Sequence, residues 1–502
     1  MRQFDVVVIG SGLGGLLSAV MLAKEGMSVA VIEQNKQVGG CLQTFSFDKK
    51  IFDSCVHYIG AVDEGQTQHR IFSYAGIMDE LKLKRMDNDC FDEIIFGDDP
   101  QVYPQAQGAS NFIAQLAPLF PGQQPVLEHY MESLKQVGGS FPLYELRTGS
   151  ESEKDLVSHW EVYETLQRLV PDARLRNVLA GNNLLYAGTR DHTPFYLHAL
   201  VCKSYIDSAY KCSGGSSQIA KLLWKRLQAY GGEVFRNEKV TGLAEEQGLL
   251  KAATTASGAV YHGRQFIANV HPATVMSWLD SNQIKPGYRK RIAGISTSIS
   301  AFMVNIVLEP GRIPYANRNT YWNRSGQSFD AVHYRPGEWP ANYALYYGED
   351  ALRPGFADTV ALLTYMHDEE MAQWQHTHNR TAETSSREAA YHEFKEQKAA
   401  QLIDTVAQRY PAIKQYLLSF KTATPLTFRD YMGSPDGGIY GMMPDVHQPM
   451  QTRVPIRTKI PNLLLAGQNV GVHGVLGVSI NAVAATAELL GMDYLLQKIN
   501  RT

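Results

Sequence analysis

Three glycines near the start of the chain have the spacing that holds a dinucleotide. Gly10, Gly12 and Gly15 form a G-x-G-x-x-G motif directly after the apolar run 6–9. Gly10 permits a tight turn, Gly12 lets the backbone approach a pyrophosphate, and Gly15 lets a helix pack closely on a strand. The N-terminus of that helix offers unpaired N–H groups to the phosphates. Glu33, at the end of the next apolar run, can accept hydrogen bonds from ribose hydroxyls and would repel a 2′-phosphate.

A second glycine pair, shortly after Glu33, favours FAD as the dinucleotide. Gly39 and Gly40 end the segment 35–40. The pair resembles the extended fingerprint of the glutathione-reductase-like FAD superfamily, in which the chain turns beneath the flavin; NAD-binding domains usually lack it. We therefore expect FAD as the cofactor. The resemblance implies cofactor contacts from both glycines and from Ser11, Leu13, Gly14, Gln34 and Cys41.

A glycine-rich loop near the end of the chain forms the other half of the expected cofactor site. The run 462–466 leads into this loop, and a helical pattern follows it. Alone, this is an ordinary strand–turn–helix connection. Beside the first fingerprint it resembles the C-terminal motif of the same superfamily, whose helix N-terminus faces the flavin and stabilises the charge of reduced flavin. The resemblance implies that Gly474 and Gly477 keep side chains away from the flavin ring, and it adds cofactor contacts from Gly467, Gln468, Val478 and, near the adenine, Val240.

These residues need a parallel sheet with helices on its faces to position them. Residues 6–9 and 29–32 read as buried strands around a helix at 16–24, which is a βαβ opening. The pattern continues with a helix, four strands and a last helix at 216–230, 233–235, 249–254, 266–270, 463–466 and 478–490. We expect an α/β fold with a Rossmann-like FAD-binding domain built from the discontinuous segments 1–71, 211–285 and 421–502.

The remaining segments, 72–210 and 286–420, are expected to form a second, substrate-binding domain. Apolar, partly β-branched runs indicate an antiparallel sheet in this domain, at 299–308, 343–347 and 360–365. Between 72 and 210 glycine turns become rare and amphipathic helices fit best, for example at 130–137 and 155–169. A long charged helix is expected at 384–408. The second domain should therefore combine a mixed, mainly antiparallel sheet with helices.

The composition is that of a globular protein without a charged macromolecular partner. The 502 residues include 47 Lys plus Arg and 50 Asp plus Glu, a net charge of −3 that gives no support for nucleic-acid binding. Five scattered cysteines suit reduced thiols and lack metal-ligand spacing, so we expect no metal. The apolar stretch 6–23 is broken by glycines and reads as strand, turn and helix rather than as a membrane span. We expect a cytoplasmic protein that meets a membrane only peripherally, at its inner face.

Three further stretches resemble the phytoene desaturase, carotenoid isomerase and retinol saturase (all-trans-retinol 13,14-reductase) family of flavoproteins. They are residues 52–60, with the pattern F-D-x-x-x-H-Y-x-G, residues 424–431, which begin with Thr-Pro, and residues 437–441. The first two are most similar to the retinol saturase and carotenoid isomerase branch. The loop 470–477 departs from the phytoene desaturases, which carry a proline there, and from the vertebrate saturase pattern.

The resemblance implies a redox change or an isomerisation at a carbon–carbon double bond of an apolar polyene or isoprenoid. Flavin N5 would exchange a hydride with the substrate, and saturation of an alkene also needs a proton donor. His57, Tyr58 and His473 are the candidate donors, because the resemblance places their segments beside the flavin. Arg429 and Tyr440 are candidate substrate contacts, although Arg429 can equally be a salt-bridged structural residue. NAD(P)H is one candidate source of electrons for the flavin.

Two other interpretations stay open. A desaturase or an amine oxidase would run the flavin in the oxidative direction on the same fold. A non-enzymatic protein would bind prenyl or other lipid chains without FAD, as the Rab GDP-dissociation inhibitors do on a related fold. The intact Gly10, Gly12, Gly15 and Glu33 argue against the non-enzymatic interpretation, because a protein without flavin does not need them.

Overall fold

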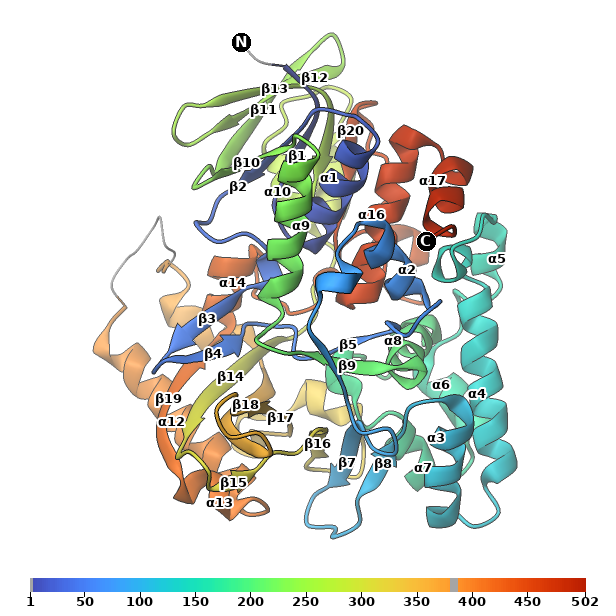
Figure 1. Cartoon of the computed structure of the whole chain (residues 1–502), viewed down its shortest axis with the longest axis vertical. Coiled ribbons are helices and arrows are strands. Elements are labelled where there is room, and N and C mark those ends of the chain that lie inside the picture. Colours follow the sequence, from blue (N-terminus) through green and yellow to red (C-terminus); the bar gives the residue numbers. More distant parts are fainter. Residues whose placement is uncertain (1–2, 380–386) are drawn as a thin grey trace.

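The computed structural model describes residues 3–379 and 387–502, which form two large sheets with helices around them (Figure 1). The strand order of the first, seven-stranded sheet is β10 (Glu233–Arg236), β2 (Val29–Glu33), β1 (Gln3–Ile9), β13 (Val260–Ala268), β12 (Leu249–Thr255) and β11 (Val240–Glu246), with β20 (Leu463–Leu465) also paired to β13. β10, β2, β1, β13 and β20 are parallel, whereas β12 and β11 extend the sheet in an antiparallel arrangement.

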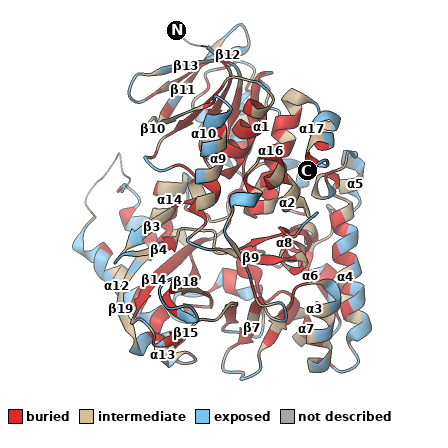
Figure 2. Ribbon diagram, viewed as in Figure 1, coloured by how far each residue is buried: buried red, intermediate tan, exposed pale blue. Residues whose placement is uncertain are grey.

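The parallel strands of this sheet are apolar because both faces are covered. Val6, Val7 and Val8 of β1 are completely buried. One face packs against α1 (Leu13–Lys24), α9 (Ser217–Ala229) and α16 (Gly474–Leu490). The other face packs against α10 (Pro272–Ser277), α11 (Pro286–Ala293) and the β11–β12 ribbon. Because both faces of these strands are buried, the strands appear in the sequence as continuous apolar runs. Figure 2 shows the buried residues of the sheet and its helices in red.

The two ends of the chain meet in this layer. β20 pairs with β13 by placing Leu463 opposite Phe266 and Leu465 opposite Ala268. α16, near the end of the chain, packs on α1, near its start. The βαβ opening that the sequence predicts is confirmed as β1, α1 and β2. The division of the chain at 71, 210, 285 and 420 stays a prediction.

The second sheet has eight strands and is mixed. Its order is β19 (Leu417–Ala423), β14 (Ser300–Leu308), β18 (Phe356–Met366), β17 (Asn342–Glu349), β16 (Asn319–Asn323), β7 (Asp92–Phe96) and β8 (Tyr103–Gln105), with β15 (Ile313–Pro314) paired to β18. All pairs are antiparallel except β7 with β16. The sheet therefore combines strands from the two segments that the sequence assigns to the second domain.

Helices lie beside this sheet (Figure 1): α3 (Ala109–Leu116), α4 (Gln124–Gly139), α5 (Glu151–Asp155), α6 (Val162–Leu169), α7 (Ala173–Leu179) and α8 (Phe195–Asp207). The expectation of helices across 72–210 is wrong at its two ends, which contain β6 (Leu83–Arg85), β7, β8 and β9 (Ala209–Cys212). β7 forms because its short apolar run pairs with β16, more than 220 residues further along the chain. A distant partner of this kind leaves no periodic signal in the local sequence.

The single helix expected at 155–169 is also wrong, because two helices occupy this stretch. α5 ends at Asp155 and α6 begins at Val162, where the carboxylate of Glu161 caps the new helix. Residues 156–159 form turns, and the chain then pairs with residues 193–195 through backbone hydrogen bonds of Trp160 and Val162. The tertiary pairing thus overrides the local helical preference.

The remaining elements complete the scaffold. The helix expected at 384–408 is α12 (Ala389–Ala407), and positions 384–386 lie outside the described residues. The other helices are α2 (Thr67–Tyr74), α13 (Pro411–Gln415), α14 (Pro425–Met432), α15 (Pro449–Thr452) and α17 (Met492–Ile499). β3 (Thr44–Phe47) pairs with β4 (Lys50–Asp53), and β9 lies between β5 (Ile59–Gly60) and β6. Within the described ranges, no helix has the length and apolar character needed to cross a membrane.

Candidate functional site

A cavity of about 700 Å³ is bordered by residues of both sheets. Its wall includes the turns after β1, β2, β13 and β20, the segment after β4, parts of α8 and α14, and one residue each of β17 and β18. The carboxyl ends of the parallel strands therefore open into this cavity. Crevices at this edge of a parallel sheet are the usual ligand sites of α/β proteins.

Nearly all the site residues expected from the sequence line this cavity. They include the candidate proton donors His57, Tyr58 and His473 and the candidate substrate contacts Arg429 and Tyr440. The expected cofactor contacts in the wall are Gly10, Ser11, Gly12, Leu13, Gly14, Glu33, Gln34, Gly39, Gly40, Cys41, Val240, Gly467, Gln468, Gly474, Gly477 and Val478. The lining does not include Gly15, where a Cβ atom would lie 2.0 Å from the carbonyl oxygen of Gly10. Gly15 therefore allows α1 to pack closely on the turn before it. For the expected residues that line the cavity, contact with a cofactor stays a prediction.

The turn between β1 and α1 presents bare backbone to the cavity. Gly10 has a φ of +94°, a conformation that favours glycine. Gly12 is the N-cap of α1, and no side chain caps this helix. A Cβ atom on Gly12 or Gly14 would lie 2.9 Å or 2.7 Å from the side chain of Asn269. The first N–H groups of α1 thus have no capping side chain and stand where a pyrophosphate can approach them.

Glu33 holds this turn in place from the end of β2. Its buried carboxylate accepts hydrogen bonds from the Ser11 N–H at 3.0 Å, the Ser11 hydroxyl at 2.5 Å and the Asn35 N–H at 2.7 Å. An ionised carboxylate has about four acceptor positions, so one more donor can be accommodated. The bare turn with an acid beside it fits the phosphates and adenosine ribose of FAD.

The C-terminal loop brings the start of α16 to the same cavity. His473 is the N-cap of α16, and no side chain caps this helix either. A Cβ atom on Gly474 would meet no atom within 4 Å, so this position leaves open space beside the helix end. A Cβ atom on Gly477 would lie 2.3 Å from the carbonyl oxygen of Val472. Gly477 is therefore needed for packing of the loop on the helix, in addition to the clearance that the resemblance implies.

His473 and Tyr440 form one aromatic unit in the cavity wall. Their rings stack with centroids 4.1 Å apart. The Tyr440 hydroxyl donates to the carbonyl oxygen of Leu184 at 2.7 Å, and His473 Nε2 lies 3.1 Å from the carbonyl oxygen of Leu185. That contact requires the proton on Nε2, so Nδ1 of the neutral ring is an acceptor. Burial lowers the pKa of His473 to about 4.

His57 lies on the opposite part of the wall as a neutral, unpaired base. Its ring stacks on Tyr346 of β17 with centroids 4.0 Å apart. Its Nε2 atom is buried without a hydrogen-bond partner among the described residues. Burial, with a smaller contribution from the charge of Lys211, lowers the pKa of His57 to about 3. The imidazole is therefore uncharged at neutral pH, and its buried Nε2 atom leaves one hydrogen-bonding position unfilled.

Arg429 lines the cavity, but its guanidinium is already engaged. It donates to the carboxylate of Asp430 at 2.7 Å and to the carbonyl oxygens of Gln375 and Thr377. Asp430 is itself completely buried and also pairs with Arg387 at 2.6 Å. These contacts support the structural interpretation of Arg429 as a salt-bridged residue that fixes α14. Its contact with a substrate stays a prediction.

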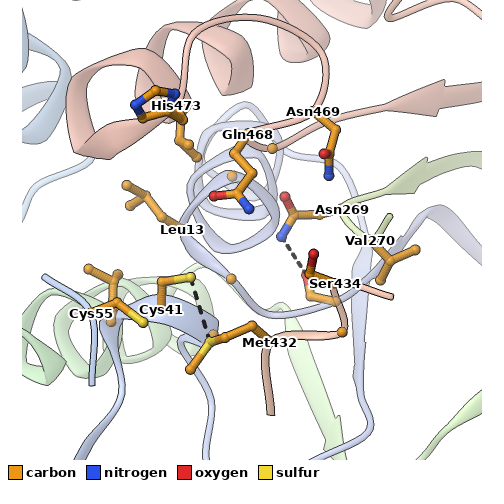
Figure 3. A pocket seen from close by; sticks show the side chains of 18 of the residues that line it. Leu13, Cys41, Cys55, Asn269, Val270, Met432, Ser434, Gln468, Asn469 and His473 are labelled. Carbon is orange, nitrogen blue, oxygen red and sulfur yellow. Dashed lines mark hydrogen bonds between the residues drawn. The ribbon is translucent and has the colours of Figure 1, made fainter. Parts of the chain in front are cut away.

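Several cavity residues were not predicted from the sequence. Figure 3 shows Asn269, Met432, Ser434 and Asn469 around the turns that the glycines form, together with Cys55 near Cys41. Asn269 follows β13 at the carboxyl end of a parallel strand, and that position was the available signal. Cys55 and Asn469 lie in stretches that the sequence analysis singles out, residues 52–60 and the C-terminal loop, but no pattern marks them as cavity residues. No local pattern marks Met432 or Ser434.

Comparison with known proteins agrees with this architecture. The family model of the NAD(P)-binding Rossmann-like domain matches residues 8–75. The all-trans-retinol 13,14-reductase of Homo sapiens is 26% identical over 541 residues, which cover 97% of this chain and 86% of that protein. The 4,4'-diapolycopene oxygenase of Methylomonas sp is 21% identical, with 93% of this chain and 94% of that protein covered.

Among solved structures, putrescine oxidase bound to putrescine superposes with a TM-score of 0.64 at 15% identity, covering 97% of this chain and 99% of that chain. At this identity the likeness concerns the fold alone. It confirms the expected fold class: an α/β fold of the kind found in putrescine oxidase, with a Rossmann-like domain and a second mixed sheet. The resemblance expected from the sequence is confirmed as well. The chain is similar along nearly its whole length to all-trans-retinol 13,14-reductases and to a 4,4'-diapolycopene oxygenase, and over 57% of its length to a 4,4'-diapophytoene desaturase.

Proposed function

We propose that this protein is an FAD-dependent oxidoreductase that acts on a carbon–carbon double bond of an apolar polyene or isoprenoid, in the manner of a saturase or isomerase. The observation that carries the proposal is that one cavity joins the bare glycine turn before α1 to an aromatic wall, to which α8, two loops and β17 of the second sheet each contribute a tyrosine. The full-length similarity to all-trans-retinol 13,14-reductases and to a carotenoid oxygenase supports this substrate class.

At one end of the cavity the residues fit the dinucleotide. The N-terminus of α1 would hold the pyrophosphate, and Glu33 would hold the adenosine ribose. The N-terminus of α16, beside Gly474, would stabilise negative charge on the reduced ring. Bound FAD would supply hydride exchange with a carbon of the substrate.

At the other end the wall suits a flat, apolar molecule. Tyr58, Tyr205, Tyr346 and Tyr440 all border the cavity, and leucines of α8 and β18 lie between them. Aromatic faces stack on conjugated chains and present little polar surface. Such a wall would orient a polyene and keep water out while hydride moves.

The two histidines expected to donate a proton do not carry that proton at neutral pH. The pKa of His57 is lowered to about 3 and that of His473 to about 4, in both cases mainly by burial. Both rings are therefore neutral at pH 7. They can accept hydrogen bonds and stack on a substrate, but the proton that saturation needs must come from another group.

The experiment is a spectrum followed by an anaerobic reaction. We expect purified protein, supplied with FAD, to be yellow. After photoreduction, all-trans-retinol should reoxidise its flavin without oxygen if saturation is the reaction. Isomerisation would change the polyene without net flavin oxidation. In parallel, the oxidised protein is mixed with putrescine. Rapid bleaching by the amine with retinol inert would refute the polyene proposal, and failure to bind FAD would favour a non-enzymatic lipid-binding protein.

NADH and NADPH are the first electron donors to test in the same anaerobic assay. Direct bleaching of the flavin by either nucleotide would identify a donor. Mass spectrometry of lipid extracted from the purified protein would then identify which apolar molecule occupies the cavity in the cell.

A further inference from the structure

A buried chain of hydroxyl groups leads from the cavity wall to one carboxyl group. Tyr346, in the wall, lies with its hydroxyl 3.3 Å from the hydroxyl of Tyr321. The Tyr321 hydroxyl lies 2.9 Å from that of Tyr58, and Tyr58 donates to Asp92 Oδ2 at 2.8 Å. Asn319 donates to the other oxygen of Asp92 at 2.9 Å. The three hydrogen bonds between Tyr346 and Asp92 form one continuous path, and Tyr58 also borders the cavity directly.

Asp92 lies where a carboxylate is costly. The residue has 0% exposure, and within the described ranges it forms no ion pair. Its partners are neutral hydroxyl and amide groups, which serve a carboxylic acid as well as a carboxylate. Burial is the main cause that raises the pKa of Asp92 to about 7. The group can therefore be protonated near neutral pH, unlike either histidine of the wall.

We propose that Asp92 is the proton store of the site and that Tyr346 is the catalytic residue that hands the proton to the substrate. In a reduction, a hydride supplied by reduced FAD would add to one carbon of the double bond, and the second carbon would form a C–H bond with the Tyr346 hydroxyl proton as that O–H bond breaks. When Asp92 is protonated, its own O–H would donate to Tyr58, the reverse of the hydrogen bond to the carboxylate. Tyr346 then takes a proton from Tyr321, Tyr321 from Tyr58, and Tyr58 from Asp92. Asp92 ends as a carboxylate and regains its proton from water after the product leaves.

The inference rests on the proposed function, because only a reduction needs this proton. It also defines the direction of the reaction, since isomerisation would leave the path unused. Asp92 acts through the tyrosines and does not itself contact the cavity. Other groups that titrate or carry charge near it are Tyr58, Cys90, Cys202, Tyr205, Lys211, Tyr321 and Tyr346.

Lys211 is the group among these neighbours that can obscure the titration of Asp92. Burial lowers its pKa to about 7, the same range as the carboxyl group. An ammonium group has no carbonyl stretch, so infrared spectroscopy separates the two. We expect the FAD-loaded protein, without substrate, to show a protonated-carboxyl band that disappears as the pH rises through about 7. The band should be missing in D92N. It should be retained in E93Q, because the carboxylate of Glu93 in the wild-type protein pairs with Arg318 and is not the proposed acid.

Turnover tests the delivery of the proton. With photoreduced protein and all-trans-retinol, the rate of saturation should be constant below pH 7 and fall about tenfold per pH unit above it, because the acid is lost. D92N should be about 100-fold slower at pH 6 and should lose this pH dependence. Y346F should be about 100-fold slower as well. Y347F is the matched control, because Tyr347 is the next residue of β17 and lies outside the cavity wall, and it should keep the wild-type rate.

The infrared titration and the turnover assay test different parts of the proposal, so each can refute its own part. If no titrating carboxyl band is lost in D92N, Asp92 is not the proton store, whatever the activity. If the band is present but D92N keeps the wild-type rate and pH profile, or Y346F reacts as fast as Y347F, the path does not deliver the proton. If the wild-type protein does not react with retinol but shows the band, the proposed substrate is wrong and the acid assignment stands.

Discussion

Replacing Glu33 by glutamine should separate binding of the adenosine half of FAD from binding of the flavin half. The carboxylate accepts hydrogen bonds from the Ser11 and Asn35 N–H groups and, in the proposed complex, from a ribose hydroxyl. Hydrogen bonds to charged groups contribute about 1.5–3 kcal/mol each. Loss of the ribose contact should therefore weaken FAD binding by roughly 10- to 150-fold, since about 1.4 kcal/mol corresponds to a factor of ten.

The glutamine also affects the protein without cofactor. Its single carbonyl oxygen can accept from only some of the donors that the carboxylate serves, and its NH₂ group then faces another N–H. A buried donor left without a partner costs about 1–3 kcal/mol, so a lower melting temperature of the apo-protein is expected. Circular dichroism at each temperature of the titration shows that the variant is folded when its affinity is measured.

The assay is a titration of apo-protein with FAD and, separately, with FMN, followed by flavin fluorescence. FMN lacks the adenosine ribose, so E33Q should bind FMN as the wild type does. E238Q is the matched control, because the Glu238 carboxylate also lies at the cavity but accepts from Thr255 and Ser257 side chains instead. Equal FAD affinities of E33Q and the wild type, or equal losses for FAD and FMN, would refute the assignment of Glu33 to the ribose.

Three further predictions concern packing, pH and thiol chemistry. G477A should lose flavin and melt at a lower temperature, because its Cβ atom would lie 2.3 Å from a carbonyl oxygen of the preceding loop, whereas G287A, which meets nothing within 4 Å, should not. Burial lowers the pKa of His198 to about 3, so between pH 6.5 and about 3 this histidine is protonated only in the unfolded chain. The free energy of unfolding should therefore decrease by about 1.4 kcal/mol for each pH unit by which the pH is lowered, and urea unfolding of H198Q should lack this contribution. A hydrogen bond with Cys55 lowers the pKa of Cys41, whereas the pKa of each other cysteine is raised. Iodoacetamide should therefore alkylate Cys41 first, and peptide mass spectrometry that finds another cysteine labelled faster would contradict this order.

The cofactor end of the site could be predicted from the sequence because its signals are local. Gly10, Gly12, Gly15 and Glu33 lie within 24 residues, and each serves a step of one strand–turn–helix–strand unit. The C-terminal loop is equally local, and its place beside the first helix followed from the resemblance rather than from any pattern in the sequence. Spacing along the chain is enough when the chain itself makes the geometry.

The proton path could not be predicted in the same way. Tyr58 and Tyr321, whose hydroxyls are in direct contact, are 263 residues apart in the chain, and the parallel pairing of β7 with β16 brings Asp92 to the same place. The sequence shows only isolated tyrosines and one aspartate in a stretch expected to be helical. The proton donor was therefore expected among His57, Tyr58 and His473, which lie next to the motifs. Burial makes both histidines neutral, and nothing in the sequence indicates that Tyr58 contacts Asp92.

The division of the site between two sheets explains how one fold can serve different substrates. In the proposed complex, the turns of the first sheet would hold the dinucleotide part of FAD, which takes no part in the reaction, so these turns can stay the same while the chemistry changes. The second sheet supplies Tyr321 and Tyr346 and, through β7, Asp92. Putrescine oxidase shares the fold at 15% identity, so the fold by itself does not select between an amine and a polyene. We propose that this selection falls to side chains of the cavity wall such as Tyr346, and the hydroxyl chain from Tyr346 to Asp92 suits a substrate that needs a proton at carbon rather than one that releases a hydride.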